Sequence, residues 1–127
     1  MNWLVFISGI VAAFAVIGHF ALGNRMFLKP MMDASFDEVA RKVMHTVFHY
    51  ISVFMVLSTL GLILSGVGVD FGLDDTLLVR FIALNYSLFA VVQVLLALTS
   101  GISGALTKMF QWTFWVIIAV LAWLGAA

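Results

Sequence analysis

Cysteine is missing from this chain of 127 residues, proline occurs once, and charged residues make up only 9% of the sequence. Without cysteine there can be no disulfide, no thiolate metal ligand and no cysteine nucleophile. Six basic residues balance six acidic ones, and the basic ones form no cluster of the kind that binds nucleic acid. Hydrophobic residues make up 65% of the chain, against ~45–50% in a soluble domain, so the composition predicts a protein in contact with a lipid bilayer.

Long uncharged stretches divide the chain into four predicted transmembrane helices, at about residues 2–23, 36–66, 77–100 and 106–126. A bilayer core of ~30 Å needs about 20 apolar residues, and each stretch supplies them. The first stretch follows no Lys or Arg and precedes no small-residue cleavage site, so we expect a retained helix rather than a signal peptide. The short links predict an all-α integral membrane protein, a single up-down antiparallel four-helix bundle over residues 1–127.

Basic residues are concentrated in the first and third predicted links. The first link, a loop over residues 25–42, contains Arg25, Lys29, Arg41 and Lys42, and the third contains Lys108. The second link has three aspartates and one arginine. Because cytoplasmic loops carry an excess of Lys and Arg, we expect links one and three on the cytoplasmic side of a bacterial inner membrane. Both termini would then lie on the outer, periplasmic side.

The second predicted helix carries a polar stripe in its first half. Ser35 and Glu38 have the spacing of a capping box, which predicts a helix start at this point. At ~100° per residue, one sector of the helix then collects five polar residues: Glu38, Lys42, His45, His49 and Ser52. A polar stripe in a spanning helix has to face protein or water rather than lipid, so it is the main functional clue in the sequence.

All three histidines are predicted at one level of the bundle. His19 is near the cytoplasmic end of the first helix, and His45 and His49 are near the cytoplasmic end of the second. Imidazoles suit Zn, Cu, Ni and Fe, three of them leave an open metal position, and two from facing helices could ligate haem. We therefore predict a metal or haem site made by His19, His45 and His49, with Gln93 as a further cofactor-binding residue. Such a site would serve transport, sensing or electron transfer.

Other interpretations of the histidines stay open. Membrane histidines often form hydrogen bonds between helices, which would suit a non-catalytic accessory or assembly subunit. Four short helices bury little surface by themselves, so we also expect a homo-oligomer or a subunit of a membrane complex. A histidine also titrates near neutral pH, which would suit a proton-coupled small-molecule transporter. The H-E-x-x-H motif of zinc proteases is absent, and Ser52 beside His49 comes without apparent oxyanion donors, so we expect no enzyme.

The first half of the chain resembles a family of small, uncharacterised bacterial inner-membrane proteins with four helices. The resemblance rests on Gly18-His19, Leu22-Gly23, Arg25, Leu28-x-Pro30 and Phe48-His49-x-x-Ser52, within residues 18–52. In that family a histidine and Leu-Gly end the first helix, and an aromatic-His pair lies in the second. Phe48 stands where the family pattern has tryptophan. The resemblance implies the four-helix topology and singles out His19 and His49, and it implies no particular activity.

Overall fold

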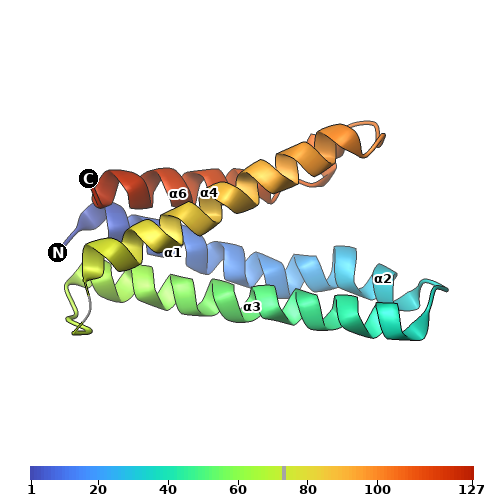
Figure 1. Ribbon diagram of the computed structural model, residues 1–127, viewed down its shortest axis with the longest axis horizontal. Helices are drawn as coiled ribbons and strands as arrows, with labels where there is room; N and C mark the ends of the chain where they lie inside the picture. Colours follow the sequence, from blue (N-terminus) through green and yellow to red (C-terminus); the bar gives the residue numbers. More distant parts are fainter. Residues whose placement is uncertain (73) are drawn as a thin grey trace.

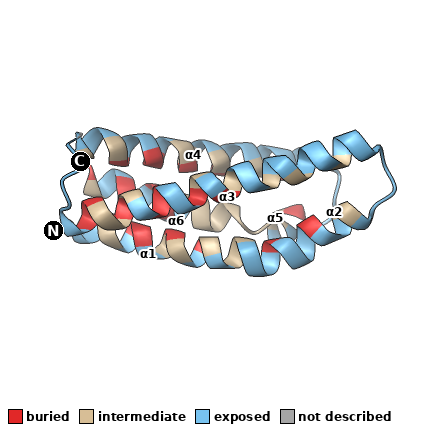
Figure 2. Ribbon diagram, turned by 90° about the horizontal axis from the view of Figure 1, so that it is seen from below, coloured by how far each residue is buried: buried red, intermediate tan, exposed pale blue. Residues whose placement is uncertain are grey.

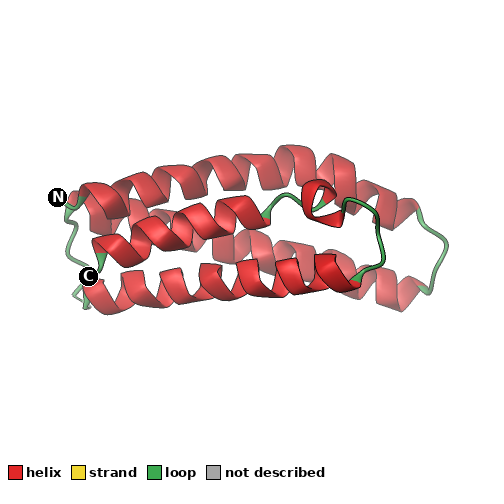
Figure 3. Ribbon diagram, turned by 90° about the horizontal axis from the view of Figure 1, so that it is seen from above, coloured by secondary structure: helices red, strands yellow, loops and turns green. Residues whose placement is uncertain are grey.

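The computed structural model describes residues 1–72 and 74–127, and over these residues every regular element is helical. The elements are α1 (Trp3–Gly18), the π-helix η1 (His19–Leu28), α2 (Lys29–Asp33), α3 (Glu38–Val67), α4 (Asp75–Thr99), α5 (Ala105–Lys108) and α6 (Trp112–Gly125). The predicted all-α fold is confirmed. Figure 3 shows that short loops join the helices.

Three helices are long and apolar enough to cross a membrane: Trp3–Asp33, Glu38–Val67 and Asp75–Thr99. The helix α6 has only 14 residues, or ~21 Å at ~1.5 Å per residue. The predicted single helix over 106–126 is therefore wrong in its first part, because a turn at residues 109–111 separates α5 from α6. The indole N–H of Trp112 donates to the Leu106 carbonyl across this break (3.0 Å), which stabilises the turn.

The first helix does not end at residue 23, as the sequence predicted. It continues through η1 and α2 to Asp33, so the predicted loop over residues 25–42 shrinks to residues 34–37. Pro30 lies at the junction of η1 and α2 within this continuous helix, where its missing N–H leaves one backbone hydrogen bond unmade. The N-cap of α3 is Asp37 rather than the predicted Ser35. The Asp37 side chain accepts the N–H of Ala40 (2.8 Å).

Two helical hairpins make up the molecule. The first hairpin (residues 3–67) pairs α1, η1 and α2 with α3, and the second hairpin (residues 75–125) pairs α4 with α6. Helix α1 also packs against α6, whereas α3 and α4 share little contact. In Figure 1 both chain termini lie at one end, here called the closed end, and the hairpins diverge toward the other, the open end.

Glycines bring the helices of the first hairpin together near the closed end. A methyl group at position 66 would lie 2.6 Å from the backbone N and Cα of Phe6, and one at Gly9 would lie 2.8 Å from the backbone N of Ile63. Small residues at such crossings are typical of helix packing in membranes. The small residues on the inner face of this helix are buried: Ser8, Gly9, Ala12, Ala15 and Gly23. Figure 2 shows most buried residues in this half of the molecule.

Polar contacts tie the closed end across both hairpins. The Asn2 backbone N–H donates to the Gly66 carbonyl (2.7 Å), and its side-chain amide donates to the Gly125 carbonyl (2.6 Å). Within the second hairpin, the guanidinium of Arg80 donates to the Ala126 carbonyl (2.8 and 3.2 Å), which holds the end of α6 against α4. About two turns deeper, the Ser8 hydroxyl donates to the Ile118 carbonyl (2.8 Å). Both hairpins are therefore joined at the closed end by hydrogen bonds as well as by packing.

Candidate ligand-binding cavity

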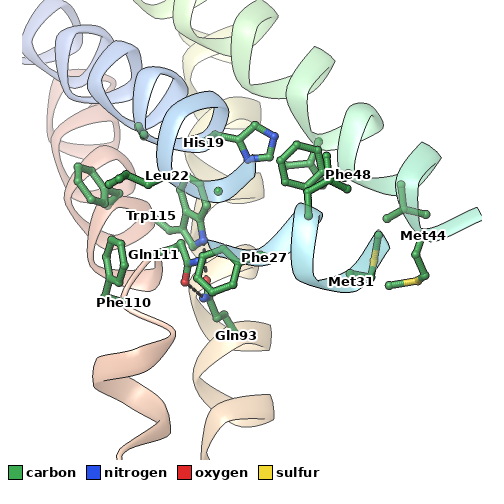
Figure 4. A pocket seen from close by; sticks show the side chains of 17 residues that line it. His19, Leu22, Phe27, Met31, Met44, Phe48, Gln93, Phe110, Gln111 and Trp115 are labelled. Atoms are coloured by element: carbon green, nitrogen blue, oxygen red, sulfur yellow. Dashed lines mark hydrogen bonds between the residues drawn. The ribbon is translucent and has the colours of Figure 1, made fainter. Parts of the chain in front are cut away.

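A cavity of about 430 Å³ lies between the two hairpins where they begin to diverge. Its volume is within the ~300–1,000 Å³ typical of small-molecule sites. Figure 4 shows η1 and α3 on one side, carrying His19, Phe27 and Phe48, and Gln93, Gln111 and Trp115 of the second hairpin on the other. The cavity is thus made by residues that are distant in sequence.

Apolar side chains form most of the cavity wall. Five aromatic rings and two methionines belong to it: Phe27, Phe48, Phe110, Phe114, Trp115, Met31 and Met44. The polar side chains are one imidazole and two amides, from His19, Gln93 and Gln111. Among the described lining residues there is no Asp, Glu, Lys or Arg. Since burying an unpaired charge is costly, this wall selects an uncharged ligand.

His19 is held between α3 and its own π-helix. The Ser52 hydroxyl donates to the Phe48 carbonyl one turn earlier (3.0 Å). Because that hydroxyl has a single hydrogen, the 2.8 Å contact between His19 Nε2 and Ser52 Oγ is a bond donated by the imidazole. The imidazole also stacks on the Phe48 ring, with centroids 4.1 Å apart and planes 17° from parallel. His19 Nδ1 is then the acceptor nitrogen, on a ring whose orientation is set by two contacts.

The two glutamines form a hydrogen-bonded group on the opposite wall. The Gln93 amide nitrogen donates to Gln111 Oε1 (2.7 Å) and to the Met109 carbonyl (3.1 Å), and Gln93 Oε1 accepts the indole N–H of Trp115 (2.8 Å). These bonds use both hydrogens of the Gln93 amide. The Gln111 amide nitrogen has no hydrogen-bond partner among the described residues, so its two N–H groups can bind a ligand.

Two irregular helical segments account for the cavity. The turn at residues 109–111 places Phe110 and Gln111 in the wall and frees the Met109 carbonyl for Gln93. In the π-helix η1 the hydrogen bonds run between residues five apart, so each turn holds more residues than a turn of α-helix. Two such turns bring His19 and Leu28, nine positions apart, to the same side. Such π-helical segments occur often at functional sites. A methyl group at Gly23, between them, would lie 3.7 Å from His19 Nδ1 and from the Phe48 ring.

His45 and His49 lie outside this cavity. Both are on α3, and their Nε2 atoms are 3.1 Å apart with ring centroids 4.9 Å apart. The structure therefore divides the predicted cluster into His19 with Ser52 and a separate His45–His49 pair. Among the described residues no group of three or more His, Asp or Glu side chains could hold one metal ion, and Gln93 bonds to Gln111, Met109 and Trp115 rather than to a histidine.

Sequence reasoning found two polar members of the cavity, His19 and Gln93, and missed its aromatic wall and the role of Gln111. Phe110, Gln111, Phe114 and Trp115 have the spacing of one helix face, a signal that could have paired them with Gln93. No family model matches this chain, and no curated protein or solved structure matches it either. The geometry of the cavity therefore carries the functional argument.

Proposed function

We propose that this chain is a multi-pass membrane protein that binds a small, uncharged and mostly apolar molecule in the cavity between its hairpins. The observation that carries the proposal is a cavity of about 430 Å³ with an aromatic wall and no charged residue in its described lining. A ligand that matches this wall gains dispersion contacts and aromatic stacking. A charged ligand would be desolvated there without a counter-charge.

The polar groups narrow the class of ligand. The Gln111 amide offers N–H donors, and His19 Nδ1, across the cavity, offers an acceptor. A neutral ring bearing a carbonyl group satisfies the Gln111 donors, and a hydroxyl on its far side would satisfy His19. A sugar does not fit, because its many hydroxyls would find few partners on this wall.

A binding assay in lipid nanodiscs tests the proposal. The probes are a neutral naphthoquinone and naphthalene, which share a ring system and differ in the two carbonyls. We expect saturable binding of both to the intact protein above the partitioning into empty nanodiscs. Gln111→Leu should weaken the naphthoquinone about 2–10-fold, the effect of one lost neutral hydrogen bond, and should leave naphthalene unchanged. Quenching of tryptophan fluorescence, with Trp115 in the wall, reports binding.

Asn85→Leu, on α4, is the matched control, since it makes the same kind of change from a carboxamide to leucine. Asn85 donates to the Phe81 carbonyl of its own helix (2.7 Å) and is not part of the cavity lining. Gly23→Leu should abolish binding of both probes. Position 23 is part of the cavity lining, and a leucine side chain there would occupy the space beside His19 and Phe48. Equal binding of the probes to Gly23→Leu and to the intact protein would contradict a ligand site here.

The orientation in the membrane follows from the charges at the two ends. Lys29, Arg41 and Lys42 lie toward the open end, with Lys108 in the link that follows α4, while Asp74 begins α4 at the closed end. By the positive-inside rule we propose that the open end and its cavity face the cytoplasm and that both termini lie outside.

Single-cysteine labelling measures this orientation, because the natural chain contains no cysteine. Ala127→Cys should react with a membrane-impermeant maleimide on intact cells. Ser35→Cys, in the link between α2 and α3, should react only after permeabilisation. The reverse pattern would place the cavity on the outer side.

An accessory or assembly role is the second candidate, and one contact favours it. The bond between His19 Nε2 and Ser52 Oγ (2.8 Å) joins the two helices of the first hairpin, as a structural histidine would. In that case His19→Ala should reduce recovery of a larger complex, while Gln111→Leu should have no effect on it. His19→Ala and Gln111→Leu together thus distinguish a structural role of the histidine from ligand binding in the cavity.

A further inference from the structure

His45 and His49 carry an inference that does not depend on the cavity. They lie one turn apart on α3, and their Nε2 atoms are 3.1 Å apart. Two imidazole nitrogens bound to one zinc ion at ~2.0–2.1 Å each in tetrahedral geometry lie ~3.3 Å apart. The two rings are therefore close to the separation they would have as neighbours on a single ion.

We propose that His45 and His49 together bind one divalent transition-metal ion, Zn²⁺, Cu²⁺ or Ni²⁺. Neutral imidazole is a preferred ligand for all three. The pair supplies two ligands, and water fills the remaining positions. This site is smaller than the three-histidine site predicted from the sequence, because His19 is engaged with Ser52 and Phe48.

The pair is placed where an ion can reach it from water. Counting about 20 residues back from Val67, the length that spans a bilayer core, puts the membrane boundary near Phe48. His49 is exposed and His45 is half-buried, and neither belongs to the lining of the cavity. An ion would therefore arrive from the aqueous side of the open end rather than through the bundle.

Two cationic side chains precede the pair on α3, and neither blocks it. Arg41 is directed toward the end of α2, where its guanidinium donates to the carbonyls of Met32 and Ala34 (both 3.4 Å). Lys42 is exposed, so its repulsion of a metal ion is screened by salt over ~8 Å at physiological ionic strength. Raising the salt concentration should therefore not weaken the binding of a divalent ion at this pair.

Titration of the purified, tag-free chain in detergent with CuCl₂ and with ZnCl₂ tests the site. We expect one ion per chain by calorimetry and, for Cu²⁺, an electron paramagnetic resonance spectrum with coupling to two nitrogens. His45→Gln and His49→Gln should each weaken binding about 100-fold, because the second imidazole acts at a high effective concentration once the first is bound. Both positions are at least partly exposed, so these variants should fold, and circular dichroism checks this.

His19→Gln is the matched control and should bind as tightly as the natural chain. Coupling to one nitrogen only, or unchanged affinity in His45→Gln and His49→Gln, would overturn the proposal. A loss in His19→Gln as large as in the other two would also overturn it, in favour of a three-histidine site. None of these results depends on whether the cavity binds naphthoquinone.

Discussion

Replacing Tyr86 by alanine is expected to lower the free energy of unfolding by about 3–5 kcal/mol, the range for removing a large buried aromatic ring. Tyr86 is fully buried, with 0% of its surface exposed. Its ring lies 5.7 Å from that of Phe54, 6.0 Å from Phe89 and 5.6 Å from Trp115, centroid to centroid. Loss of the ring leaves a void between the hairpins, and in a bilayer packing supplies much of the helix association.

Chemical unfolding in detergent, followed by circular dichroism, measures the effect, and two variants bracket it. Tyr86→Phe keeps the ring and loses only the bond between the Tyr86 and Ser58 hydroxyls (2.8 Å), so it should cost about 1 kcal/mol. Tyr50→Ala removes the same side chain at a position 67% exposed and should stay within about 0.5 kcal/mol of the natural chain. A Tyr86→Ala variant as stable as Tyr50→Ala would show that the hairpins do not pack as described.

Gly66→Ala is expected to destabilise the protein by about 1–3 kcal/mol, the usual cost of overpacking. The added methyl group would meet the backbone N and Cα of Phe6 at 2.6 Å. Backbone atoms cannot turn aside as a flexible side chain does, so α1 and α3 have to separate. That separation also strains the bond from the Asn2 N–H to the Gly66 carbonyl (2.7 Å).

Gly18→Ala provides the matched control for this substitution. A methyl group at position 18, at the end of α1, would meet nothing within 4 Å. Because alanine favours a helix over glycine by up to about 1 kcal/mol, this variant should be as stable as the natural chain or more stable. Equal loss of stability in the two variants would contradict the close approach of α1 and α3.

The helices that could be predicted well are those whose ends carry clear chemical signals. Residues 36–66 and 77–100 were predicted, and α3 and α4 cover Glu38–Val67 and Asp75–Thr99. Gly68, with a φ of +85°, ends α3 as glycine does at many helix C-termini. The first helix was predicted to end too early because Arg25 and Pro30 suggested a loop. The helix carries both, with Arg25 exposed and Pro30 at the junction between η1 and α2.

The site was harder to predict than the fold. Hydropathy reports which residues avoid water, and it contains no information about a π-helical segment or a turn inside an apolar stretch. Both irregularities depend on contacts with neighbouring helices, which one segment of sequence does not reveal. The separation of His19 from His45 and His49 has the same origin, since it depends on the bond from His19 to Ser52 and on the stacking with Phe48.

The hydrogen bonds of Asn2 and Ser8 to the second hairpin have a mechanical consequence. They join the two hairpins at the closed end, so a relative motion of the hairpins that keeps these bonds is a rotation about that end. In such a rotation the displacement grows with distance from the pivot. A small tilt that leaves the glycine contacts near Phe6 almost unchanged would widen or narrow the gap between His19 and Gln111 much more. A ligand that bridges those two side chains would therefore set the angle between the hairpins.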